Sequence, residues 1–184
     1  MIQLGHYAIL ASLCFCAYGM IAGVWGGKQR NLAWVRSAEN AVIANFVLIL
    51  TASVSLWYLL LTDNFLVKYV TEYSSGDMPT HFKFTAFWGG QDGSLLLWAL
   101  VLSVFATVAI VQNRHRHRSL MPYVAVCLLG VMFFFSLLLN FAANPFERRF
   151  RDLHTIAQQL QGRAAHFETV GQHLLGLDAD TTFL

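Results

Sequence analysis

Residues 121–141 read MPYVAVCLLGVMFFFSLLLNF, a run without a single Asp, Glu, Lys or Arg. The hydrocarbon core of a bilayer is about 30 Å thick, so a helix that rises about 1.5 Å per residue needs about 20 mostly apolar residues to cross it. Three further runs without charged residues occupy residues 7–24, 41–61 and 95–111. The pattern predicts an all-α membrane protein with about four transmembrane helices.

The composition supports this fold class. Hydrophobic residues make up 57% of the 184 residues and charged residues only 12%, whereas ordinary soluble domains carry about 25% charged residues. A disordered chain is excluded and a soluble globule is disfavoured. The net charge is only +2, and the basic residues form short clusters between apolar runs, so we expect a membrane partner and no nucleic acid.

The basic residues also predict an orientation, because short cytoplasmic connections carry an excess of Lys and Arg. The connection of residues 62–94 is longer and holds two lysines against four acidic residues. We therefore expect a multi-pass protein of the inner membrane, with the loop of residues 62–94 on the external, periplasmic side. Basic residues in the two short connections support this orientation, and three arginines that follow the fourth run argue against it: Lys28, Arg30, Arg36, Arg114, Arg116 and Arg118 in the first set, and Arg148, Arg149 and Arg151 in the second.

The composition changes once, after Pro145. Residues 1–146 contain all four apolar runs and form the predicted membrane region. Residues 147–184 contain no apolar run longer than three residues, and this pattern predicts a polar, partly helical tail.

The most informative connection is the stretch from Trp88 to Trp98, which reads WGGQDGSLLLW. Its three glycines allow positive φ and close backbone approach, and Asp92 or Ser94 is a candidate N-cap of the third membrane helix. The N-terminal end of that helix suits an anionic ligand group. The simpler interpretation is an ordinary turn with ordinary caps and an aromatic residue of the membrane interface. The candidate site residues are Trp88, Gly89, Gly90, Asp92 and Gly93.

Aromatic residues at positions 82, 84, 87 and 88 surround Lys83 and His81 just before this stretch. The pattern predicts a segment that lies at the membrane surface. Such a segment is either a docking face for a planar apolar ligand or merely an anchor for the loop.

Other site chemistries are not indicated. The chain has no phosphate-binding loop, nucleophile elbow, zinc signature or carboxylate pair, so a self-contained hydrolase or kinase is excluded. No acidic residue lies inside the apolar runs, which disfavours a pump or an ion carrier. The few polar residues inside the runs are expected to form hydrogen bonds between helices or to their own backbone.

Four segments together carry a resemblance to a known family: Gly5-His6-Tyr7, residues 63–70, the stretch from Trp88 to Trp98, and Asn144-Pro145-Phe146. In order and spacing they resemble the N-terminal region of CcmF and NrfE, the large membrane subunits of the cytochrome c haem lyase. The resemblance implies a role in joining haem to the Cys-x-x-Cys-His motif of apocytochrome c. It implies haem as the cofactor, and as partners the other haem lyase subunits, a haem chaperone and apocytochrome c.

The chain departs from the family pattern in its tail. Family members are several times longer, and their haem ligands and tryptophan-rich haem-contact motif lie beyond the point where the resemblance stops. A frameshift, a truncation or a split gene with a complementing chain explains such a tail. We therefore expect a fragment of a haem lyase that lacks the axial ligands and is not catalytic alone. The alternative is a structural membrane scaffold subunit that meets no ligand.

Overall fold

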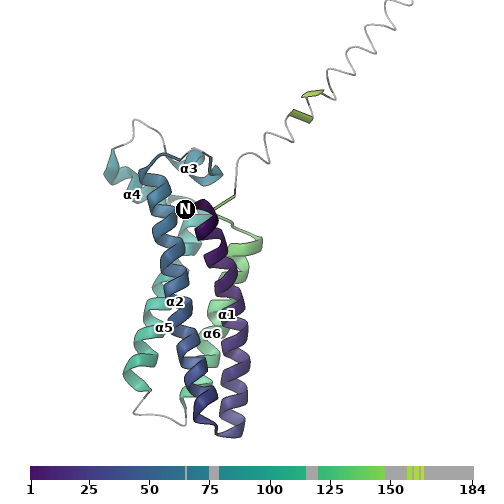
Figure 1. Ribbon diagram of the computed structural model, residues 1–184. Coiled ribbons are helices and arrows are strands. Elements are labelled where there is room, and N and C mark those ends of the chain that lie inside the picture. Colours follow the sequence, from purple (N-terminus) through teal and green to yellow (C-terminus); the bar gives the residue numbers. More distant parts are fainter. Residues whose placement is uncertain are drawn as a thin grey trace, which may run out of the picture. The chain divides into compact units, whose positions relative to one another are not determined.

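The computed structural model describes residues 1–64, 66–74, 79–114 and 120–147, together with positions 157, 158, 160, 161 and 163. In the short helix that begins at Thr80, the side chains of Thr80, His81 and Phe84 lie outside this description. The chain divides into two units, Met1–Glu147 and Arg148–Leu184. The fold described below is that of the first unit (Figure 1).

Four long helices form a bundle: α1 (Ile2–Gln29), α2 (Leu32–Leu61), α5 (Gln91–Asn113) and α6 (Met121–Phe141). Each is long and apolar enough to cross a membrane, which confirms the predicted fold class. Three of them extend beyond the apolar runs, because helical backbone hydrogen bonds continue into flanking polar residues. At the start of α2, for example, Asn31 Oδ1 accepts a hydrogen bond from the Ala33 N–H at 3.0 Å.

The connection between α2 and α5, predicted as a long loop, contains two short helices. They are α3 (Lys68–Tyr73) and α4 (Thr80–Gly89). Both lie at the end of the bundle where the chain begins (Figure 1). This end, built from α3, α4, the first turns of α1 and α5 and the segment after α6, is called the outer cap below.

Small residues let the long helices approach one another. A side chain at Gly19 of α1 would meet Ala41 of α2 and Leu129 of α6, and one at Gly23 would meet Val126 of α6. Close approach through small residues is the usual means of helix packing in membranes, where the hydrophobic effect does not drive helices together.

Polar side chains connect three helices in the middle of the bundle. Ser12 Oγ of α1 donates to Asn45 Oδ1 of α2 at 2.6 Å and lies 2.7 Å from Ser136 Oγ of α6. All three residues are buried, and this trio is called the serine–asparagine network. Other polar residues in α2 bond to their own helix, as Ser53 does to the Ile49 carbonyl oxygen at 2.9 Å. Both predicted uses of the polar residues are thus confirmed, although Asn45 Nδ2 and Thr107 Oγ1 have no partner within the described part of the chain.

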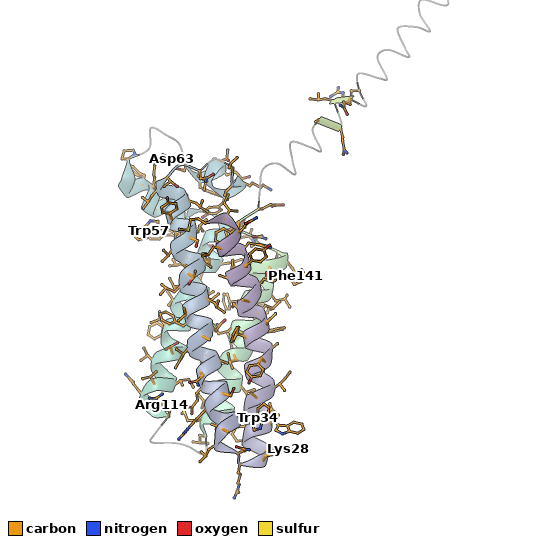
Figure 2. All side chains as sticks on the ribbon, in the orientation of Figure 1. Lys28, Trp34, Trp57, Asp63, Arg114 and Phe141 are labelled. Atoms are coloured by element: carbon orange, nitrogen blue, oxygen red, sulfur yellow. The ribbon has the colours of Figure 1, made fainter. Side chains whose placement is uncertain are left out.

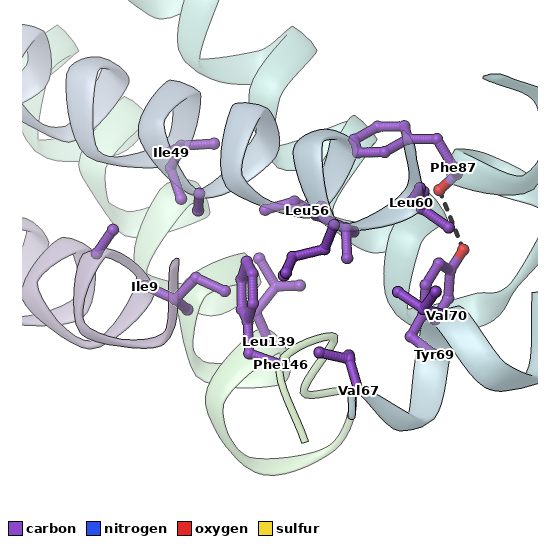
Figure 3. Packing of buried hydrophobic residues seen from close by; sticks show 14 of the residues in the cluster. Ile9, Ile49, Leu56, Leu60, Val67, Tyr69, Val70, Phe87, Leu139 and Phe146 are labelled. Carbon is purple, nitrogen blue, oxygen red and sulfur yellow. Dashed lines mark hydrogen bonds between the residues drawn. The ribbon is translucent and has the colours of Figure 1, made fainter. Parts of the chain in front are cut away.

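The two ends of the bundle differ in charge and in structure. Lys28, Trp34 and Arg114 lie at one end, and Trp57 and Asp63 lie at the other (Figure 2). The outer cap has its own apolar core, in which Phe146 packs with residues of α1, α2 and α3 (Figure 3). The described residues of the connection 62–94 therefore lie at the same end of the bundle as the N-terminus, opposite the basic turn between α1 and α2.

Candidate functional site

The glycine-rich stretch forms the junction between α4 and α5. Helix α4 ends at Gly89, α5 begins at Gln91, and only Gly90 lies between them. The predicted N-caps are wrong: α5 has no side-chain cap, Asp92 lies in its first turn, and Ser94 Oγ donates to the Gln91 carbonyl oxygen at 2.8 Å. Helix α5 begins earlier than those caps would place it. The Gly90 N–H that precedes it is bonded to the hydroxyl of Tyr69, a buried residue outside the stretch.

The glycines at this junction provide space and not unusual backbone angles. No glycine in the described part of the chain has a positive φ, so that prediction is wrong. The prediction of close approach is confirmed at two of the three positions. A Cβ at Gly90 would lie 2.5 Å from Tyr73 Cε2, and one at Gly93 would overlap the Phe87 carbonyl oxygen and the Tyr69 hydroxyl. Gly89 has room, because its nearest neighbour is Tyr73 at 4.0 Å.

The buried group at the junction is Tyr69 of α3, which is 3% exposed. Its hydroxyl lies 2.9 Å from the Ala86 carbonyl oxygen and 3.1 Å from that of Phe87, to which it donates (Figure 3). It accepts from the Gly90 N–H at 3.2 Å. Burial raises the pKa of Tyr69 to about 12, so the phenol keeps its proton at physiological pH. The Gly90 N–H, which immediately precedes α5, is thus bonded to Tyr69 and is not open to a ligand.

Sequence reasoning missed Tyr69 as part of the site. The residue falls inside the segment of residues 63–70 that carries the family resemblance, and that was its only signal. No local pattern links it to carbonyl groups that lie 17 and 18 positions later.

Trp88 lies beside an apolar groove between α2, α4 and α5. The groove has a volume of about 290 Å³. Trp88 is 42% exposed and Trp57, which also lines the groove, is 40% exposed. Such a surface suits an apolar group, whether a flat ring or a side chain of another helix. The lining residues are Leu50, Ser53, Val54, Trp57, Phe87, Trp88, Leu97 and Leu100.

The segment around Lys83 was predicted to lie at the membrane surface, where a lysine would be exposed. In the structure Lys83 is buried and paired with Asp63. Its Nζ lies 2.5 Å from Asp63 Oδ2, and the ammonium side chain is only 9% exposed. Asp63 Oδ1 also accepts from Ser74 Oγ at 3.1 Å. The hydrogen bond from Lys83 lowers the pKa of the Asp63 carboxyl. The pair connects α4 to the residues that follow α2 and so helps to hold the outer cap together.

The segment after α6 completes the cap. The Lys68 N–H donates to the Glu147 carbonyl oxygen at 3.0 Å, and the Asn144 side-chain nitrogen lies 3.3 Å from His6 Nδ1. The ring of Phe146 covers Gly5, where any side chain would collide with it. The four segments that carry the resemblance, although far apart in sequence, thus meet at one end of the bundle.

The five predicted site residues divide into two groups. Trp88 and Gly89 are exposed and Asp92 is half-buried, so these can contact a ligand. Gly90 and Gly93 are buried against tyrosine rings and support the junction.

The residues around the junction fit the apolar face of a haem better than its iron. Among the described residues, no three His, Cys, Asp or Glu side chains gather closely enough to hold a metal ion. The groove is lined by carbon-rich side chains and a serine that bonds to its own helix. None of these eight residues carries an imidazole, thiol or carboxylate that could ligate iron.

Comparisons with known proteins agree with the resemblance, although no family model matches the chain. The chain is 30% identical over 163 residues to the cytochrome c-type biogenesis protein CcmF of Haemophilus influenzae, a match that covers 86% of this chain and 24% of that protein. It is 35% identical over 166 residues to the cytochrome c-type biogenesis protein NrfE of the same organism, covering 86% of this chain and 26% of NrfE.

Two further matches extend this result. CycK of Rhizobium meliloti, also a cytochrome c-type biogenesis protein, is 29% identical over 171 residues, covering 90% of this chain and 25% of CycK. This match leaves only a tenth of the chain uncovered, so it includes some residues after Pro145. The solved structure of a cytochrome c haem lyase, CcmF, superposes with a TM-score of 0.74 at 25% identity, over 79% of this chain and 24% of the lyase. The chain thus spans about a quarter of the length of the relatives it matches.

Proposed function

This chain is homologous over most of its length to cytochrome c-type biogenesis proteins of the CcmF and NrfE type, and from that premise we propose that it serves cytochrome c biogenesis as part of a membrane haem lyase. In this role it helps to attach haem to apocytochrome c and does not carry out the reaction alone. Haem supplies the vinyl groups to which the apocytochrome thiols are joined.

The apolar groove beside the α4–α5 junction is the observation that carries this proposal. Trp88 presents its ring at the edge of the groove, and Gly89 and Asp92 lie next to it in the chain. We assign these three residues to a docking turn for haem or for the apocytochrome segment that receives it. Gly90 and Gly93 hold the turn in place against the tyrosines.

The charges at the two ends support the orientation that we propose. Lys28, Arg30 and Arg36 are exposed at the end opposite the outer cap, and the positive-inside rule assigns that end to the cytoplasm. The outer cap then faces the periplasm, the side on which a haem chaperone, apocytochrome c and the other haem lyase subunits would meet it. A complementing chain with the remaining membrane helices would pack beside the same bundle.

The test is the level of c-type cytochromes with covalently bound haem, measured by haem-stained gels of membranes after deletion of the gene. Deletion is expected to lower that level, and the wild-type gene to restore it. Trp88→Ala is expected to restore it only in part, because the docking turn loses its ring. Trp34→Ala is the matched control, since Trp34 is similarly exposed, at 40%, but lies at the opposite end. Unchanged cytochrome levels after deletion would contradict the proposal.

A structural scaffold subunit is the second candidate function. Its support is that the junction is occupied by internal contacts. The Gly90 N–H bonds to Tyr69, and Gly90 and Gly93 pack against the tyrosine rings, as they would in an ordinary helix junction without a ligand. Spectroscopy of the chain purified with its partners separates the two functions. A Soret band that weakens in Trp88→Ala supports haem contact, and its absence favours the scaffold.

A further inference from the structure

One hydroxyl group serves two helix ends at the α4–α5 junction. The last carbonyl groups of a helix and the first N–H groups of the next have no partner within their own helices. Tyr69 shares its proton between the carbonyl oxygens of Ala86 and Phe87, at 2.9 and 3.1 Å, and accepts from the Gly90 N–H at 3.2 Å. Helix α5 has no side-chain cap of its own.

The backbone preference of Gly90 alone does not select the angle between α4 and α5. Gly90 has φ −103° and ψ 162°, an extended conformation that any residue adopts. The angle is set instead by what packs against the junction. The Tyr73 ring packs against that of Tyr69, with centroids 4.8 Å apart and planes tilted by 35°. Gly90 leaves room for both rings and Gly93 for that of Tyr69.

This angle matters because the end of α4 forms one wall of the groove. Phe87 and Trp88 are the groove residues that α4 supplies, while Trp57 belongs to α2. Tyr69 does not line the groove, yet it binds the Phe87 carbonyl oxygen directly. A change at Tyr69 is therefore transmitted to the wall through one backbone group.

We propose that Tyr69 is a positioning residue, whose hydroxyl places Phe87 and Trp88 and thereby sets the width of the apolar groove. Only the effect on haem attachment rests on the proposed function. The placement of Trp88 can be tested without it.

The first test uses the full chain labelled with 5-fluorotryptophan in lipid nanodiscs. The chain has five tryptophans, and substitution of each by Phe assigns its fluorine resonance. Tyr69→Phe removes only the hydroxyl and should raise the population of a displaced α4 at least roughly 5-fold, the factor expected for loss of even one of its buried hydrogen bonds to the Phe87 carbonyl oxygen and from the Gly90 N–H. The Trp88 resonance should shift or split, while those of Trp25 and Trp34 stay in place.

Tyr73→Phe is the matched control, because it removes a hydroxyl from the ring packed against Tyr69 and should leave the Trp88 resonance unchanged. Unchanged Trp88 and Trp57 resonances in Tyr69→Phe would overturn the proposal. A collapse of all five resonances would also overturn it, because the hydroxyl would then be required for folding and not for placement.

A second variant displaces the rings without removing the hydroxyl. Gly90→Ala puts a methyl group 2.5 Å from Tyr73 and 2.7 Å from Tyr69, so it should move the same Trp88 resonance. Gly89→Ala adds a methyl group whose nearest contact outside the adjacent residues is Tyr73 at 4.0 Å, and it should move that resonance much less. Equal spectra for the two variants would contradict the proposal.

The last arm measures haem attachment in the deletion strain. Tyr69→Phe should lower the level of haem-bound cytochrome c for the same amount of membrane-inserted protein, and Tyr73→Phe should not. If the wild-type gene itself has no effect on that level, the proposed function fails while the fluorine result stands. If the gene restores the level and Tyr69→Phe restores it fully, the positioning role is wrong.

Discussion

The middle of the bundle and the outer cap are held together in different ways. In the middle, long helices meet along many residues, and small side chains such as Gly19 and Gly23 allow contact. In the cap, short segments that are distant in sequence pack around an apolar core, and single polar groups such as the Tyr69 hydroxyl and the Asp63 carboxylate join them. The contacts in the middle are therefore redundant, so the loss of one leaves many others. The arrangement of the cap depends on single polar groups.

The largest expected effect is that of Gly93→Ala in the cap. Its methyl group would overlap the Phe87 carbonyl oxygen and the Tyr69 hydroxyl, and one of these is backbone that cannot rotate away. Overpacking of this kind costs about 3 kcal/mol. Thermal unfolding in nanodiscs measures it, with Gly89→Ala as the control. Equal stability of the two variants would show that the cap adapts as easily as the middle.

A smaller effect is expected from Ser12→Ala in the serine–asparagine network. The variant removes hydrogen bonds to Asn45 and Ser136, and interhelical hydrogen bonds in membranes contribute about 1 kcal/mol or less each. The control is Ser53→Ala, because the Ser53 hydroxyl bonds only to its own helix. A loss as large as that of Gly93→Ala would remove the distinction between the two regions.

The two regions should also differ in their response to acid. The lowered pKa of Asp63 means that its pairing with Lys83 stabilises the cap above the ordinary carboxyl pKa of about 3.9. This stabilisation is lost as pH falls through the folded-state pKa, because the protonated carboxyl no longer attracts the ammonium group. Unfolding midpoints measured from about pH 7 down to about pH 3 should therefore fall for the wild type.

Asp63→Asn provides the control for the acid response. An amide does not titrate, so the variant should start lower at neutral pH and show a flatter profile. The same slope in both proteins would mean that the Asp63–Lys83 pair does not determine the pH response.

The smallest expected effect lies at the opposite end, in the turn between α1 and α2. Arg30 has φ 51°, a left-handed conformation that costs a side chain about 1 kcal/mol. Glycine removes this cost, but it also raises the conformational entropy of the unfolded chain, which offsets part of the gain. Arg30→Gly should therefore stabilise the protein by about 0.5 kcal/mol. Arg30→Ala keeps the strain and should not stabilise it. Equal unfolding midpoints for the Gly and Ala variants would contradict this expectation.

The sequence predicted the bundle well, because the signal for a membrane helix is local. A run such as residues 121–141 needs no knowledge of the rest of the chain, and its bounds agree with α6. The polar residues inside the runs were also interpreted correctly, since lipid offers them no other partners. Even so, the sequence does not show which helix Ser12 faces.

The outer cap was predicted less well, because its contacts are non-local. The three glycines indicated close approach but not which ring approaches, and they suggested a positive φ that the structure does not use. Asp92 and Ser94 were expected to cap α5, but Tyr69 is bonded to the backbone at Gly90 instead. The origin of residues 147–184 stays a prediction, because nearly all of them lie outside the described part of the chain.

The contact between Phe146 and Gly5 has a consequence for assembly. These two residues are in contact, but in sequence they lie near opposite ends of the unit Met1–Glu147. The outer cap therefore closes only after all four helices have left the ribosome. Until then the first turn of α1 lacks the aromatic cover that Phe146 places on Gly5. The bundle is thus sealed by the segment after its fourth helix against the first turn of its first helix, and a nascent chain released before residue 146 would be inserted in the bilayer but unfinished at its outer end.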